Sequence, residues 1–245
     1  MCDWATCRCE NARMTTLPSG TVTFVFSDIE GSTGLLKRLG EQYGELIAQH
    51  RRVVRETFGE QGGVEIDMQG DSFFFAFARA RDAVAAAVAA QRAHAEQSWP
   101  GEESVRVRMG LHTGEPAVGA EGYLGVDVVR AARICGSGQG GHVLLSEATR
   151  ALLGSSLPEG VSVHAVGDRQ LKDIDEPERV YELAIEGVEQ PEAEAPASSG
   201  DEREDEWDIR AADFKDRMRE KITKSVFESL ERSLGDIGKR RSKID

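Results

Sequence analysis

The sequence predicts an α+β domain followed by a separate amphipathic helix. Runs with strand alternation and runs with helical spacing follow one another in the order β-α-β-β-α-β within residues 20–187. That order is the split βαβ, ferredoxin-like arrangement, with an antiparallel or mixed sheet and its helices on one face. We therefore expect the other face to remain available for a partner chain or a ligand. An acidic segment then separates this domain from a second helical pattern.

The first half of the domain supplies the β-α-β-β part of this order. Residues 21–26 alternate between the two faces of a predicted strand. Apolar residues at helical spacing over 32–58 predict a helix, which ends at Gly62-Gly63 because glycine weakens helices. Residues 64–69 and 73–77 predict two short strands joined by a Gly-Asp turn.

The second half begins with an alanine-rich helix over 80–96. Its N-cap position holds Arg79 instead of Ser or Asp, so we expect a frayed start. Residues 106–112 alternate arginine with apolar side chains and predict a strand. The remaining predicted elements are a helix over 125–135, a strand over 143–145, a short helix from Ser146 and terminal strands within 161–185.

Three segments lie outside this domain. Residues 1–19 are expected to be disordered, as chain ends often are. Residues 188–206 are rich in Glu, Asp, Pro and Ser and predict a flexible linker. Residues 207–245 predict an amphipathic helix with a basic tail. Two interpretations of it stay open: a helix that packs on the domain or pairs with its copy, or one that contacts a partner protein or a membrane surface.

The composition limits the classes of function. The 245 residues carry a net charge of −13, which argues against nucleic-acid binding because that function needs a basic face. No apolar run approaches the ~18 residues of a membrane span. No secretory signal pattern is present. We therefore expect a cytoplasmic protein.

The end of the first predicted strand is the most informative part of the chain. The apolar run ends in Asp28, and a Gly31-Ser32-Thr33 turn leads into the helix. A carboxylate there can hold a divalent cation, while helix amides meet phosphate oxygens. Asp71, in the Gly-Asp turn, supplies a second carboxylate. Two such aspartates suit a metal-bridged nucleoside triphosphate, although Asp28 could also serve as a helix N-cap.

Several ordered segments resemble the class III nucleotidyl cyclase catalytic domain, the adenylate and guanylate cyclase family. The resemblance covers residues 20–187, most of the chain. The segments are Thr21–Thr33, Gly70-Asp71, Arg106–Glu115, Gly125–Arg133, Gly141–Ser146 and the closing Leu171–Leu183, which is similar to bacterial members.

The resemblance implies conversion of ATP or GTP into a 3′,5′-cyclic nucleotide and pyrophosphate. Two Mg²⁺ or Mn²⁺ ions would be held by Asp28 and Asp71, with the carbonyl of Ile29 as a further ligand. The residues implied to contact phosphate are Gly31, Ser32 and Thr33. The family builds its site from two chains, so the resemblance also implies a homodimer or a heterodimer.

Several implied substrate positions depart from the family's pattern. Asp67 stands where a lysine usually recognises adenine, and Gly122 stands where that lysine's Asp or Thr partner is usual. An acid at position 67 can accept hydrogen bonds from guanine N1–H and N2–H, which favours guanine. Val129 replaces the asparagine that orients the ribose, and loss of such a donor costs about 10²–10³ in rate. Arg133 retains the arginine that neutralises the developing phosphorane charge.

Two hypotheses therefore stay open. The first is a slow, metal-dependent purine nucleotidyl cyclase that works as a dimer, which Asp28, Asp71 and Arg133 favour. The second is a degenerate cyclase fold that binds a nucleotide or docks a partner without turnover, which the changed positions 67, 122 and 129 favour.

Other polar residues are expected to be structural. His50 and His94 lie on predicted helices without metal-ligand spacing, and His112 lies within a strand. Cys135 is expected to be a small buried residue.

Overall fold

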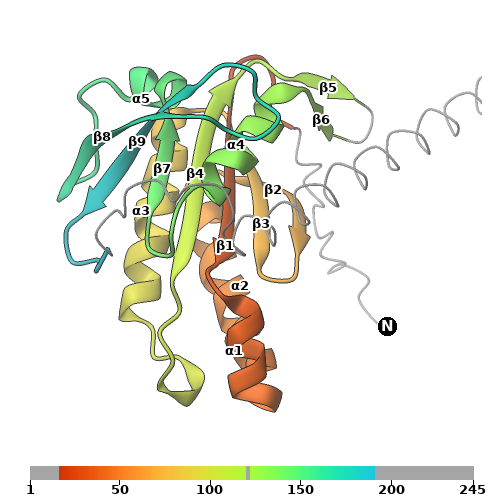
Figure 1. Ribbon diagram of the computed structural model, residues 1–245, viewed down its shortest axis with the longest axis vertical. Helices are drawn as coiled ribbons and strands as arrows, with labels where there is room; N and C mark the ends of the chain where they lie inside the picture. The colour runs from red at the N-terminus through yellow and green to blue at the C-terminus, as the bar shows by residue number, and fades with distance from the viewer. Residues whose placement is uncertain (1–16, 120–121, 191–245) are drawn as a thin grey trace, which may run out of the picture.

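A seven-stranded sheet runs through the part of the chain that the computed structural model describes, residues 17–119 and 122–190 (Figure 1). Its order is β2-β3-β1-β4-β7-β9-β8, and all neighbours pair antiparallel except β4 and β7, which are parallel. The strands are β1 (Val22–Ile29), β2 (Val64–Gln69), β3 (Ser72–Phe77), β4 (Val107–Gly114), β7 (Val143–Ser146), β8 (Val161–Arg169) and β9 (Glu178–Ile185). The order β2-β3-β1-β4 is that of a ferredoxin-like core, so the predicted α+β class is confirmed.

The α-helices of the described residues are α1 (Ser32–Leu39), α2 (Tyr43–Glu60), α3 (Ala80–Glu96), α4 (Val126–Gly136) and α5 (Glu147–Leu153). The single helix predicted over 32–58 is in fact two helices. Gly40 separates them with φ 53° and ψ −116°, a conformation that residues with a side chain rarely adopt. A hairpin of β5 (Ala117–Gly119) and β6 (Gly122–Leu124) was not predicted, because each strand is too short to show alternation.

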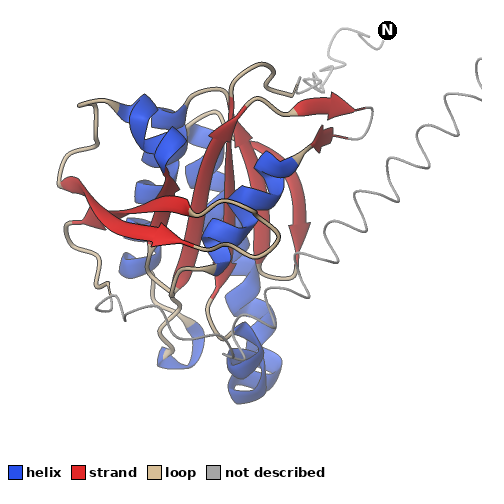
Figure 2. Cartoon of the chain, turned by 45° about the horizontal axis from the view of Figure 1, so that its top comes forward, coloured by secondary structure: helices blue, strands red, loops and turns tan. Residues whose placement is uncertain are grey.

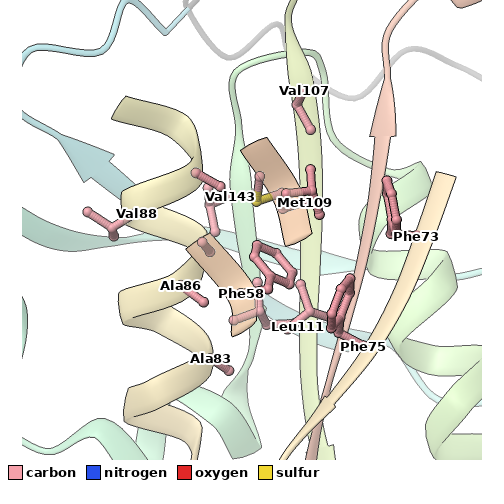
Figure 3. Packing of buried hydrophobic residues seen from close by; sticks show 14 of the residues in the cluster. Phe58, Phe73, Phe75, Ala83, Ala86, Val88, Val107, Met109, Leu111 and Val143 are labelled. Carbon is pink, nitrogen blue, oxygen red and sulfur yellow. The ribbon is translucent and has the colours of Figure 1, made fainter. Parts of the chain in front are cut away.

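One face of the sheet packs against α1, α2 and α3. Phe73, Phe75 and Leu111 from the strands meet Phe58 of α2 and the alanines of α3 in a continuous buried cluster (Figure 3). The small alanine side chains let α3 approach the sheet closely. Each fully buried Phe or Leu contributes about 1.5–3 kcal/mol to the free energy of unfolding.

The expectation that the other face stays open is wrong. Helix α4 crosses it and packs through Val128, Ala131 and Cys135 onto Phe24 and Phe26 of β1 (Figure 2). Strand β1 carries large apolar side chains on both faces and is buried along its whole length.

Helix α4 lies very close to β4 at Gly110. A Cβ atom placed on Gly110 would stand 2.2 Å from the backbone nitrogen of Cys135. The glycine therefore permits the contact between helix and strand.

The domain extends slightly beyond its predicted limits. The hydroxyl of Tyr123 donates to the carbonyl of Pro18 at 2.6 Å, and the amide of Gln190 donates to the carbonyl of Leu183 at 2.8 Å. Residues 1–16, most of the predicted linker and the predicted C-terminal helix over 207–245 lie outside the described residues. Within the described residues, the search for a helix long and apolar enough to span a bilayer finds none.

The Gly110→Ala variant is expected to lower the free energy of unfolding by about 1–3 kcal/mol, because the methyl group must push α4 away from β4. Urea denaturation of the purified chain measures this change. Gly44→Ala on α2 is the matched control, since its Cβ meets no atom within 4 Å. The control should gain about 0.5–1 kcal/mol. Equal stability of the two variants would contradict the tight contact at Gly110.

Candidate active site

Two carboxylates lie side by side where β1 ends next to the β2–β3 turn. Asp28 is fully buried and Asp71 is 4% exposed. The backbone N–H of Ile29 donates to Asp71 Oδ2 at 3.1 Å, and the hydroxyl of Ser72 donates to Asp28 Oδ1 at 2.6 Å. Each carboxylate therefore accepts a hydrogen bond from the chain neighbour of the other aspartate.

A buried arginine, which was not predicted as a site residue, compensates the charge of Asp28. The antiparallel register places Arg108 of β4 directly opposite Asp28. Arg108 Nη2 lies 2.8 Å and Nε 3.2 Å from Asp28 Oδ2. Burial disfavours the charged guanidinium, but the Asp28 carboxylate outweighs it and raises the pKa of Arg108. The available signal was an arginine between the apolar residues Val107 and Met109 of a predicted strand, since a buried arginine requires a partner.

Helix α2 holds the turn that carries Asp71. Arg51 donates from Nε and Nη2 to the carbonyl of Gly70 at 3.1 and 2.7 Å. His50 Nε2 lies 2.9 Å from the carbonyl of Asp71, and its Nδ1 lies 2.9 Å from Nε2 of His94. The expectation that these histidines are structural agrees with their burial, but their pairing was hidden by their separation along the chain.

The two histidines form a chain of three short contacts between two carbonyl groups. His94 Nδ1 lies 2.7 Å from the carbonyl of Ala90, at the end opposite to Asp71. Three such contacts need three ring protons, because carbonyls only accept, whereas two neutral imidazoles carry two protons. Burial, together with the neighbouring His94, lowers the pKa of His50 to about 3, and burial lowers that of His94 to about 4. The folded pair is therefore neutral near pH 7, and one contact lacks its proton.

The Gly31-Ser32-Thr33 turn follows Asp28 after two residues, Ile29 and Glu30. Gly31 has a left-handed conformation with φ 64°, which turns the chain from β1 into α1. Ser32 is buried and Thr33 is exposed. Helix α1 thus begins at Ser32, four residues after Asp28.

The four predicted substrate positions lie on other elements. Asp67 lies on β2, next to a register irregularity, and Gly122 lies on β6 with φ 132°. Val129 and Arg133 are four residues apart on α4 and share one face of that helix. Cys135, on the opposite face, contacts the carbonyl of Arg108 and is fully buried, as expected. Arg133 therefore points away from the sheet that carries Asp28.

The oxygen atoms at the acidic pair fit a divalent cation of the Mg²⁺ or Mn²⁺ class. Two carboxylates and a backbone carbonyl are hard donors, and Mg²⁺ commonly combines one or two carboxylates with substrate phosphates and water. Asp28 Oδ2 is bonded to Arg108, so a cation at that oxygen must compete with the guanidinium. No group of three or more His, Cys, Asp or Glu side chains suited to a metal gathers among the residues described.

The fold and its sequence segments define a domain of the class III nucleotidyl cyclase type. A family model described as the adenylate and guanylate cyclase catalytic domain matches residues 14–184. The chain belongs to this family.

Relatives of known sequence include proteins named adenylate cyclase and proteins named uncharacterized. An uncharacterized protein of Mycobacterium tuberculosis (strain ATCC 25618 / H37Rv) is 37% identical over 168 residues, which are 68% of this chain and 56% of the relative. An adenylate cyclase of Podospora anserina is 26% identical over 221 residues, covering 68% of this chain and 10% of that protein. The chain thus spans about half the length of the mycobacterial relative.

Solved structures agree with the fold. Adenylate cyclases from Trypanosoma brucei in their monomeric state superpose with a TM-score of 0.64 at 25% identity, covering 72% of this chain and 93% of that chain. The guanylate cyclase domain of RhGC from Catenaria anguillulae, in complex with GTP, gives a TM-score of 0.61 at 18% identity, covering 68% and 97%. The second similarity shows the fold alone.

The free energy of unfolding is expected to fall as the pH drops from about 6.5 toward 4, because the unfolded chain binds protons that His94 cannot bind when folded. His94 alone should contribute a loss of roughly 2 kcal/mol between pH 7 and pH 4.5. Urea denaturation across this pH range measures the slope. His94→Gln should reduce this slope but not abolish it, because the buried His50 contributes a slope of the same sign. His164→Gln, at an exposed histidine of β8, should leave the slope unchanged. An unchanged slope in His94→Gln would show that His94 is not the buried neutral group.

Proposed function

We propose that this domain is a slow purine nucleotidyl cyclase that converts ATP or GTP into a 3′,5′-cyclic nucleotide and pyrophosphate. The observation that carries the proposal is the adjacency of the Asp28 and Asp71 carboxylates at the end of β1. Family membership supports the same reaction class.

The reaction joins the ribose 3′-oxygen to the α-phosphorus and breaks the bond to the β-phosphate, so that pyrophosphate leaves with the bonding electrons. Two Mg²⁺ or Mn²⁺ ions, when bound, would lower the charge on the attacking and leaving oxygens. Asp28, Asp71 and the carbonyl of Ile29 would hold them. The phosphate contacts are assigned to the amides of Gly31, Ser32 and Thr33.

Two chains are needed in this proposal, as a homodimer or a heterodimer. Cys135 of α4 packs against β4, the strand whose Arg108 pairs with Asp28. Arg133 lies on the opposite face of the same helix. Because that face is directed away from the acidic pair of its own chain, Arg133 is assigned to the acidic pair of another chain. There it would neutralise the charge that develops on the phosphorane.

The residue at position 67 supports guanine as the base. At the other base-recognition position, Gly122 offers no side chain. Asp67 is half-buried on the edge strand β2. A carboxylate there can accept from guanine N1–H and N2–H, whereas adenine N1 offers only an acceptor.

Val129 favours a second candidate function, a cyclase fold that binds a nucleotide or docks a partner without turnover. Its side chain packs against the buried cluster around Leu171 and Ile174. It cannot supply the hydrogen bond that would orient the ribose.

The purified chain is expected to form cyclic nucleotide from GTP with Mn²⁺, measured by liquid chromatography of product and pyrophosphate. Asp71→Asn should lower the rate about 100-fold or more, because a metal ligand loses its charge. Asp71→Asn is preferable to a change at Asp28, whose loss would leave Arg108 buried without a counter-charge. Asp82→Asn on α3, where Asp82 pairs with Arg79, is the control and should keep the rate. Saturable GTP binding without product in the unaltered chain would favour the second candidate function.

Mixing Asp71→Asn with Arg133→Ala tests the shared site. Each variant alone should be nearly inactive, whereas the mixture should recover about a quarter of the original rate through heterodimers with one intact site. Failure to recover activity, with both variants folded and dimeric by light scattering, would argue against a site built from two chains.

Asp67→Lys tests the base preference. The unaltered chain should use GTP with a higher kcat/KM than ATP, and the variant should change that ratio by about tenfold or more toward ATP, since a charged hydrogen bond is lost. The same ratio in both proteins would place base recognition elsewhere.

A further inference from the structure

The connection between β8 and β9 covers the outer face of α4. We call this connection together with Glu178, the first residue of β9, the β8–β9 segment (residues 170–178), and Figure 1 shows it beside α4. Leu171 and Ile174 are buried and pack in one cluster with Ile134 of α4 and Val180, against which Val129 also packs. The segment is therefore fixed to the helix by apolar contacts on both sides of Asp173.

Two ion pairs join this segment to α4. Arg133 Nη2 lies 2.8 Å from Asp173 Oδ2, and Arg130 Nη1 lies 2.6 Å from Glu178 Oε2. The two pairs differ in exposure, since the side chain of Asp173 is 60% exposed and that of Glu178 is 8% exposed. The Arg130 pair thus anchors the segment, whereas the Asp173 carboxylate lies at the solvent boundary.

The backbone presents the Asp173 carboxylate to Arg133. Asp173 has φ 61°, a left-handed conformation that is uncommon for residues other than glycine but is tolerated by Asp and Asn. Anchors at Leu171 and Ile174 hold the chain on either side of it. The Arg133 side chain is only 10% exposed.

We infer that Asp173 is an internal anion that competes with polyphosphate for the Arg133 guanidinium. The inference rests on the proposed function, in which Arg133 faces the phosphates. A polyphosphate that binds Arg133 Nη2 must displace the Asp173 carboxylate. The Arg130–Glu178 pair, whose carboxylate is 8% exposed, keeps the segment in place. Displacement is feasible because the Asp173 side chain is 60% exposed and water can solvate its carboxylate when it leaves Arg133. Ion pairs between exposed side chains typically change an equilibrium by about fivefold or less.

In this arrangement the β8–β9 segment opposes the binding of polyphosphate to Arg133. In the free chain the Asp173 carboxylate gives the mostly buried Arg133 guanidinium a counter-charge. Bound polyphosphate replaces the carboxylate, and the cost of that exchange lowers the apparent affinity. Asp173 is thus a positioning residue for Arg133 and touches no reacting atom.

The test compares Asp173→Asn with Asp175→Asn in the full chain. Asn keeps the tolerance for positive φ and removes one charge, and Asp175 is an exposed aspartate of the same segment that gives the same change in net charge. Phenylglyoxal labelling of Arg133, followed by peptide mass spectrometry, reports access to the guanidinium. Inorganic pyrophosphate is the competing anion, and its half-protecting concentration reports binding at Arg133.

Asp173→Asn is expected to label Arg133 two- to fivefold faster and to be half-protected at a two- to fivefold lower pyrophosphate concentration. Asp175→Asn should match the unaltered chain in both measurements. An unchanged half-protecting concentration in Asp173→Asn, or no protection by pyrophosphate, would overturn the inference whatever the labelling rate. Absence of cyclic product from all three proteins, with the labelling and protection differences retained, would count against the proposed catalysis alone.

Discussion

The charge of Asp28, fully buried at the end of β1, constrains the arrangement of the surrounding elements. A buried carboxylate without compensation is costly, and here Arg108 of β4 and Ser72 of β3 provide that compensation from the two neighbouring strands. The same register that pairs β1 with β3 and β4 thus brings the acidic residues together. Both the stability of the sheet and the electrostatics of the site depend on the contacts of Asp28 with Arg108 and Ser72. A divalent cation would enter a site whose charge is already partly balanced by Arg108.

Helix α4 links the fold to the site in a second way. One face of it packs on β1 and β4 over Gly110, and the opposite face carries Val129 and Arg133. Side chains on the two faces of one helix cannot act on the same point. This geometry gives a physical reason for a site shared between chains, and the ion pair with Asp173 gives Arg133 a partner within its own chain.

The sequence predicted most elements because their patterns are local. The bounds of β2 and α3 coincide with the predicted ranges. Glycines flank β2, and a change from strand alternation to helical spacing of the apolar residues marks α3. The break at Gly40 was missed because apolar spacing continues across it, and α4 was not placed on the second face because helical periodicity does not say which face of a sheet a helix covers. Asp28 and Asp71 were recognisable as candidates from strand ends and glycine turns. Arg108, His50 and Arg51 were not assigned to the site, because their partners are far away in the chain and the pairing depends on strand register for Arg108 and on helix packing for the other two.

The most direct test of the central claim is a crystal structure of the chain with Mn²⁺ and a non-hydrolysable GTP analogue, using anomalous scattering to locate the metal. The account requires manganese peaks within coordination distance of the carboxylates of both Asp28 and Asp71, with Asp28 Oδ2 released from Arg108. Manganese bound elsewhere, with the Asp28–Arg108 ion pair intact, would contradict it.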